Sequence, residues 1–277
     1  SDWSSDVCSS DLIDLFHKMG IYGVDMFLLV SGMGIYYSMR KSRSAGEFYK
    51  KRAIRILPVY FLLSISWYVF FKTDVSLGDK LLSIFGINYF RGTVYKIQEF
   101  FDWFIPFITV LYLLTPLYDK LFQKAAVKWK LTCLVAMISP ALGVLAHFTH
   151  RQVLYFSITR IPIYLIGYCV GYFLYEKKEE KKDSWMVWLS MLFVGVLIVY
   201  LLQYYFNTYD VKWGSRAYTG VLLAPPICMF FALLCMYVEK LKIVGKILLF
   251  PFKICGRYSL EIYLLHQRLI EIVNSDK

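Results

Sequence analysis

Long, uninterrupted apolar runs constrain this chain more than any other feature. Several of them reach the roughly 20 residues that a helix needs to cross the bilayer core, and they lack the alternation of membrane β-strands. Hydrophobic residues make up 58% of the 277 residues and charged residues 18%, whereas soluble domains carry about a quarter charged residues. The sequence therefore predicts an all-α, polytopic transmembrane helical bundle. It disfavours a soluble enzyme, a disordered chain and a nucleic-acid-binding domain.

About eight segments are long enough to span: 21–39, 56–72, 101–118, 130–148, 157–175, 185–206, 217–238 and 256–273. Pro58 and Pro106 lie just after the starts of two of them and suit a first helical turn. Segment 244–254 is too short to span and is predicted to lie at the membrane interface. Residues 73–100 form the longest loop, with a short helix expected at 79–87.

The first residues differ in character from the rest of the chain. Residues 1–12 begin SDWSSDVCSSD, are rich in Ser and Asp, and lack the basic start and apolar core of a signal peptide. The string resembles a translated sequencing adapter. We therefore expect a non-native tail at 1–12, a membrane domain at 13–277, and a native chain that begins further upstream.

Basic residues are distributed unevenly among the loops, and the net charge is +11. Of the 31 Lys and Arg residues, 20 fall in one alternating set of loops: 40–55, 119–130, 176–183 and 239–257. Because Lys and Arg concentrate in cytoplasmic loops, this set is predicted to face the cytoplasm and loop 73–100 the outside.

Charged residues inside spans are costly and mark functional candidates. Asp25 lies seven residues before Gly32 on one helix face, and Arg160 shares a face with Gly167 and Gly171. These glycines would let helices approach closely. Asp25 could instead be a helix N-cap at the outer boundary, and Arg160 an interfacial residue that extends its charge to the surface.

Two further groups complete the candidates. In the last span, His266 lies on one face with Ser259 and Tyr263, although a satisfied core histidine is the plainer interpretation. Arg52 and Arg55 are three residues apart at the cytoplasmic mouth of a span. They are either a topogenic charge cluster or a clamp for a phosphorylated ligand, because guanidinium groups fork onto phosphate oxygens.

Five segments, in order, resemble the acyltransferase family 3 membrane proteins. GVDMFLLVSG at 23–32 resembles the family's GVD-F-F--SG helix, and KKRAIRILPVY at 50–60 its basic R--RI-P-Y segment. WFIPFITVLYLLTPL at 103–117 resembles a third segment but lacks its usual acidic part. RIPIYLIGYCVG at 160–171 and YSLEIYLLHQ at 258–267 are similar to two later segments.

The resemblance covers about residues 15–273 and implies a ten-helix bundle of which the first and last helices are missing here. The family's catalytic histidine lies on its first helix, and His17 is too close to Gly23 to match it. The resemblance therefore implies that this chain alone is inactive.

The resemblance also implies a function: transfer of an acyl group, with acetyl expected, from acyl-CoA to a carbohydrate hydroxyl of a cell-surface glycan. We expect His266 and Asp25 as catalytic candidates, and a substrate-binding set of Arg52, Arg55, Arg160, Trp103 and Ser31. The expected partners are acyl-CoA, a carbohydrate acceptor and the lipid bilayer of a bacterial cytoplasmic membrane. Neither a metal, a tightly bound cofactor nor nucleic acid is expected.

Two other classes stay open from the residues alone. Intramembrane charges and kinked helices also suit a transporter or flippase for a glycan or lipid-linked precursor. A structural subunit of a polysaccharide export complex would neither bind coenzyme A nor carry a substrate flux.

Overall fold

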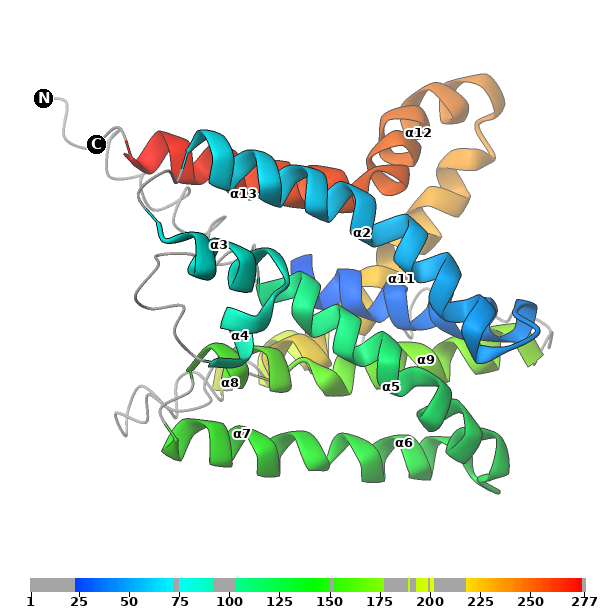
Figure 1. Cartoon of the computed structure of the whole chain (residues 1–277). Coiled ribbons are helices and arrows are strands. Elements are labelled where there is room, and N and C mark those ends of the chain that lie inside the picture. Colours follow the sequence, from blue (N-terminus) through cyan, green and yellow to red (C-terminus); the bar gives the residue numbers. More distant parts are fainter. Residues whose placement is uncertain are drawn as a thin grey trace, which may run out of the picture. The chain divides into compact units, whose positions relative to one another are not determined.

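The protein is described by a computed structural model that covers residues 23–71, 75–91, 103–149, 152–176, 189, 193–198, 200–201 and 218–275. The ordered segments of this part of the chain are helices, which confirms the predicted all-α class (Figure 1). The tail at 1–12, and most of the predicted span 185–206, lie outside the described residues.

A first helix occupies residues 23–41. After it come α2 (Ala45–Phe70), α3 (Leu77–Ile84), α4 (Ile87–Arg91), α5 (Phe104–Lys124), α6 (Lys128–Ala136), α7 (Ile138–Phe148), α8 (Gln152–Ile158), α9 (Ile161–Glu176), α11 (Thr219–Glu239), α12 (Lys242–Arg257) and α13 (Ser259–Ser275).

Four stretches of helix are long and apolar enough to cross a membrane, within the part of the chain that the structure describes. They are Ala45–Phe70, Phe104–Lys124, Lys128–Ala146 and Gly220–Glu239, and Ile161–Glu176 is a shorter apolar helix. The predicted short helix at 79–87 corresponds to α3 and α4, and the predicted interfacial segment 244–254 lies within α12.

The chain divides into two compact units. The first comprises Ser1–Tyr37, Trp129–Ser139 and Thr159–Leu233; the second comprises Ser38–Lys128, Pro140–Ile158 and Leu234–Lys277.

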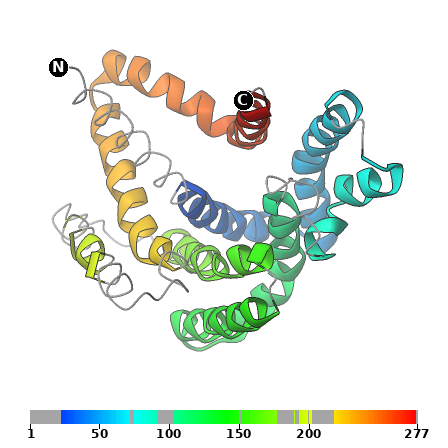
Figure 2. The same ribbon diagram turned by 90° about the vertical axis from the view of Figure 1, so that its left-hand side faces the viewer.

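In the first unit, glycines bring residues 23–37 and α9 into backbone contact (Figure 2, blue and green). A Cβ atom on Gly32 would meet the carbonyl oxygen of Tyr164, and one on Gly167 would meet that of Leu29. A Cβ on Gly171 would press on Met33 in the same way. The close approach that the sequence predicted for Gly32 and the Gly167/Gly171 pair is confirmed.

In the second unit, α2 is the central element and contacts α3, α5 and α13. Figure 1 shows α13 running alongside α2. The turn between α3 and α4 depends on Gly86, whose φ is 71°. Glycine adopts this left-handed backbone without cost, and a Cβ there would also collide with Pro106 of α5.

Helix α2 begins eleven residues before the predicted span at 56–72. Ser44 caps it by accepting a hydrogen bond from the backbone N–H of Glu47 at 3.2 Å, the arrangement that starts a helix in a capping box. Pro58 therefore lies inside the helix, and its predicted first-turn position is wrong. Pro106 lies in the first turn of α5, as predicted.

Candidate functional site

An ion pair is buried in the first unit. The Nε of Arg160 lies 3.3 Å from Oδ1 of Asp25, and the two side chains are 9% and 7% exposed. Asp25 projects from within the helix 23–41, and Arg160 immediately precedes α9. The alternatives of a helix N-cap for Asp25 and a surface-reaching Arg160 are therefore both wrong, because each residue is buried against the other.

Helix α11 closes over this pair. Gly220 lies so near the Asp25 carboxylate that a Cβ atom on it would overlap the carboxylate oxygen Oδ2. Only glycine fits this position without moving the carboxylate. Three helical segments thus enclose one carboxylate–guanidinium pair, and the sequence had marked Asp25 and Arg160 separately without showing that they meet.

Ser31 lies further along the same helix as Asp25, and its side chain is half-buried. Six residues of helix rotate the chain by about 240°, so Ser31 points to a different face from Asp25. The structure thus places Ser31 apart from the ion pair, on another side of the helix that carries it.

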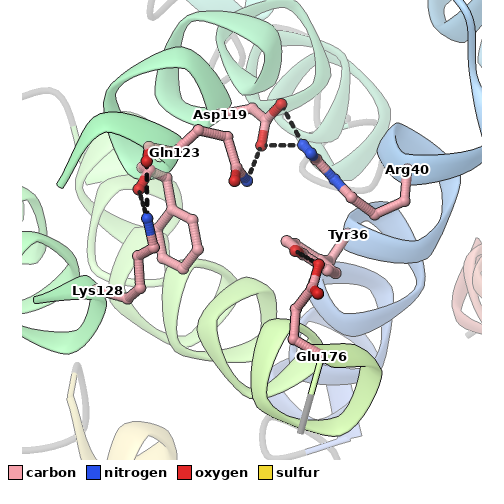
Figure 3. A network of polar contacts seen from close by, with 7 residues as sticks. Tyr36, Arg40, Asp119, Gln123, Lys128 and Glu176 are labelled. Carbon is pink, nitrogen blue, oxygen red and sulfur yellow. Dashed lines mark hydrogen bonds and ion pairs between the residues drawn. The ribbon is translucent and has the colours of Figure 1, made fainter. Parts of the chain in front are cut away.

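Aromatic residues gather at the other end of this helix. The rings of Tyr36 and Tyr168 contact edge to face at 5.2 Å between centroids, and those of Tyr36 and Tyr172 at 5.8 Å. The Tyr36 hydroxyl donates a hydrogen bond to the Glu176 carboxylate at 3.0 Å (Figure 3). This cluster joins the helix to the last turn of α9.

A second ion pair lies in the second unit. Nη2 of Arg40 donates to both carboxylate oxygens of Asp119 at 2.5 Å, and the Gln123 side-chain amide donates to Asp119 Oδ1 at 2.9 Å (Figure 3). Sequence reasoning missed this pair because it treated both charges as residues of cytoplasmic loops. The structure shows that α5 continues to Lys124, so Asp119 is a residue of the helix and not of a loop.

Arg52 lies on α2 in a different environment. Its guanidinium carbon is 5.8 Å from the ring centroid of Phe48 and 5.9 Å from that of Tyr112 on α5. The Nε of Arg52 is buried and has no hydrogen-bond acceptor within the described residues. Cation–π contacts of this kind hold a guanidinium without neutralising its charge.

Arg55 lies three residues later and is exposed. No ion pair or hydrogen bond of Arg55 falls within the part of the chain that the structure describes. Arg52 and Arg55 therefore present two uncompensated positive charges in the N-terminal half of α2, as the clamp hypothesis requires.

The remaining candidates, Trp103 and His266, belong to one series of contacting aromatic rings in the second unit. Trp103 contacts Phe104 at the start of α5, Phe104 contacts Tyr263 on α13 at 5.0 Å between ring centroids, and Tyr263 contacts His266 at 5.5 Å. His266 is exposed, so the interpretation as a buried core histidine is wrong.

The ring of His266 also contacts its own helix. Its Nδ1 lies 3.1 Å from the carbonyl oxygen of Ile262. Because a carbonyl can only accept a hydrogen bond, Nδ1 must carry the proton in this contact. The neutral imidazole then has its lone pair on Nε2, which is the atom that could accept a proton.

Arg268, which no sequence pattern marked, is buried on the same helix. Its guanidinium carbon lies 4.7 Å from the ring centroid of Trp67 on α2.

Outside the predicted membrane spans, burial raises the pKa of the Tyr89 hydroxyl on α4 to about 12, despite its hydrogen bond with Ser157. No group of three His, Cys, Asp or Glu side chains among the described residues could hold a metal ion.

Comparison with known proteins gives a family match. A family model described as "Acyltransferase domain" matches residues 9–276. Curated relatives named O-acetyltransferase OatA, from Staphylococcus aureus strains NCTC 8325, COL and MRSA252, are 27% identical over 92% of the chain and 47% of their own length. The chain thus spans about half the length of these relatives. No solved structure matches it significantly.

Proposed function

This chain belongs to the acyltransferase domain family, and from that premise we propose that it serves the transfer of an acetyl group from acyl-CoA to a hydroxyl of a cell-surface carbohydrate. The membrane would be the bacterial cytoplasmic membrane. Support comes from the family, from the name of the O-acetyltransferase relatives and from the apolar helices that could span a bilayer.

The proposed reaction sets three requirements for the protein, which follow from its steps. The acceptor hydroxyl oxygen attacks the thioester carbonyl, so that a C–O bond forms and the C–S bond breaks. The hydroxyl proton passes to a base and then to the departing coenzyme A thiolate. The protein must therefore hold the donor phosphates, supply a base near neutral pH, and place the hydroxyl against the carbonyl.

The observation that carries the proposal is the state of Arg52. Arg40, in the same unit, is neutralised by Asp119, whereas the contacts of Arg52 among the described residues are with the rings of Phe48 and Tyr112. A half-buried guanidinium with an unsatisfied Nε suits an anionic ligand, because charge-assisted hydrogen bonds to phosphate satisfy both its charge and its donors. Arg55 would add a second phosphate contact. The donor would therefore enter from the cytoplasmic side.

His266 is the candidate base among the described residues. With Nδ1 donating to Ile262, its exposed Nε2 would take the hydroxyl proton. Asp25 is engaged by Arg160, which favours a positioning role for this carboxylate over proton transfer. Trp103 is linked to His266 through the rings of Phe104 and Tyr263, and it offers a flat apolar surface on which a sugar ring could stack.

The test is binding of radiolabelled acetyl-CoA to the protein in nanodiscs. Arg52→Ala should weaken binding by about 1–3 kcal/mol, roughly fivefold to 150-fold, the range for hydrogen bonds to charged groups. Arg52→Lys should restore part of the binding, since lysine keeps the positive charge but cannot form the bidentate hydrogen bonds of a guanidinium. Arg43→Ala is the matched control, because Arg43 is an exposed arginine of the same predicted cytoplasmic segment.

Equal binding by the parent and Arg52→Ala would overturn the donor site. The rival function is tested in parallel in proteoliposomes with a polysaccharide acceptor inside, by following free thiol from coenzyme A and glycan flux. Flux of glycan without release of thiol would favour a transporter over an acyltransferase.

A further inference from the structure

Helix α12 differs in charge from the helices around it. Its sequence, KIVGKILLFPFKICGR, has four basic residues and no acidic one. Its 16 residues span about 24 Å at 1.5 Å per residue, short of the roughly 30 Å of a bilayer core. It lies between α11 and α13 in the chain (Figure 1). A helix of this length and charge cannot cross the membrane unaided.

Three of the basic residues of α12 lie on one side of the helix. At about 100° per residue, Lys246, Lys253 and Arg257 fall within an arc of about 40°, and Lys242 begins the helix with a left-handed φ of 49°. All four side chains are exposed. Lys253 forms an exposed ion pair with Glu239 at 3.1 Å. Lys242, Lys246 and Arg257 have no acidic partner within the described residues, so this side of the helix and its first residue form a stripe of uncompensated positive charge.

An exposed apolar face lies directly beside this basic stripe. Ile243, Ile247, Phe250 and Ile254 occupy the adjoining arc, and their exposed fractions are 73%, 68%, 64% and 42%. The side that packs inward carries the small Gly245, where a Cβ would meet the carbonyl oxygen of Val238 at the end of α11, and the buried Leu249. Helix α12 therefore has a packed face, a basic stripe and an apolar face around its circumference.

This arrangement identifies the kind of surface that α12 fits. Helices that lie in the membrane interface place apolar side chains among the acyl chains and basic side chains among the headgroups. Anionic headgroups attract such clusters of Lys and Arg. We propose that α12 lies in the membrane interface and that Lys242, Lys246 and Arg257 bind the headgroups of anionic phospholipids.

The experiment uses the whole chain, with all cysteines replaced and a single fluorescent label on Ile247→Cys in the apolar face. The protein is reconstituted in phosphatidylcholine vesicles with increasing fractions of phosphatidylglycerol. Spin-labelled lipids then quench the fluorophore, with the spin label at the headgroup, at the top of the acyl chain or near its end. Comparing spin-labelled phosphatidylglycerol with spin-labelled phosphatidylcholine measures the enrichment of anionic lipid at α12.

We expect stronger quenching from the headgroup and the top of the chain than from the chain end. We also expect phosphatidylglycerol to quench more than phosphatidylcholine. The combined variant Lys242→Gln, Lys246→Gln and Arg257→Gln should lower the phosphatidylglycerol enrichment at least about fivefold, the effect expected for one cation at an anionic surface. High salt should weaken the enrichment in the parent.

A matched variant removes three exposed cations elsewhere, by Lys41→Gln, Arg43→Gln and Lys50→Gln, and should keep the enrichment at Ile247→Cys. Strongest quenching from the chain end would overturn the proposal in favour of a spanning segment. A label that no lipid quenches would show that α12 faces water. Equal quenching by both lipids in the parent would show that the stripe does not select anionic headgroups.

Discussion

The buried pair of Asp25 and Arg160 allows a stability prediction whose size comes from its geometry. At 3.3 Å and an effective dielectric constant of about 20, the attraction between unit charges is about 5 kcal/mol. Removing one partner leaves the other charge buried and uncompensated, which typically costs about 3–5 kcal/mol. We therefore expect Asp25→Asn to lower the free energy of unfolding by about 3 kcal/mol or more.

A double-mutant cycle distinguishes the contribution of the ion pair to stability from that of side-chain packing. Arg160→Met should destabilise the protein as well, but Asp25→Asn combined with Arg160→Met should cost less than the sum of the two, because no unpaired charge remains. A coupling of about 1–3 kcal/mol is expected for side chains in direct contact. Unfolding is monitored by helical circular dichroism during titration with sodium dodecyl sulfate in mixed micelles.

Glu239→Gln provides the control. This substitution breaks the ion pair between Glu239 and Lys253, whose side chains are 58% and 64% exposed. Exposed ion pairs contribute about 0–1 kcal/mol to the free energy of unfolding. If Asp25→Asn costs no more than Glu239→Gln, or if the effects of Asp25→Asn and Arg160→Met simply add, the buried pair does not stabilise this unit.

Other contacts and charges of the chain allow four more predictions. Gly167→Ala should destabilise the protein by about 1–3 kcal/mol through overpacking against Leu29, whereas Gly34→Ala, where a Cβ meets open space, should be neutral or stabilising in thermal denaturation. Asp119→Asn should lower stability by about 1–3 kcal/mol in the same assay, because it weakens charged hydrogen bonds from Arg40; an unchanged midpoint would contradict this. His266→Gln should lower acetyl transfer by an active form of the protein while acetyl-CoA binding stays at the parental level, and unchanged turnover would place the base elsewhere. Cysteine at Lys41 should react with an impermeant thiol reagent only after lysis and cysteine at Gly78 in intact cells, and the opposite pattern would reverse the predicted orientation.

Local patterns in the sequence predicted which segments form helices better than which helices and side chains contact one another. The apolar runs indicated helices, and the spacing of Gly32, Gly167 and Gly171 indicated close helix contact, because small residues at helical intervals form a continuous face. The same patterns carried no information on which charge meets which. Asp25 and Arg160 are far apart in sequence, and helices that are apolar all round give no period from which a partner face can be read.

The loop assignments explain why other contacts escaped prediction. Basic residues at 40–55 suggested a cytoplasmic loop, yet Ser44 and Glu47 start a helix there and place Arg52 against Phe48, one turn earlier. Charge frequency alone could not separate Arg40, which Asp119 neutralises, from Arg52. That distinction depends on tertiary contacts between helices, which the positive-inside pattern does not encode.

The contrast between neutralised and uncompensated cations links the two proposals. Arg40 and Arg160 each have a carboxylate partner within their own unit, so their charges serve the fold. Arg52, like the basic stripe of α12, has no such partner among the described residues, and both belong to segments that the distribution of Lys and Arg assigns to the cytoplasm. Phosphate is the anion that both arrangements suit, in a soluble donor for Arg52 and in lipid headgroups for α12. A reversed orientation would remove the cytoplasmic donor from reach of Arg52 but leave anionic headgroups available to α12, so the two proposals can fail independently.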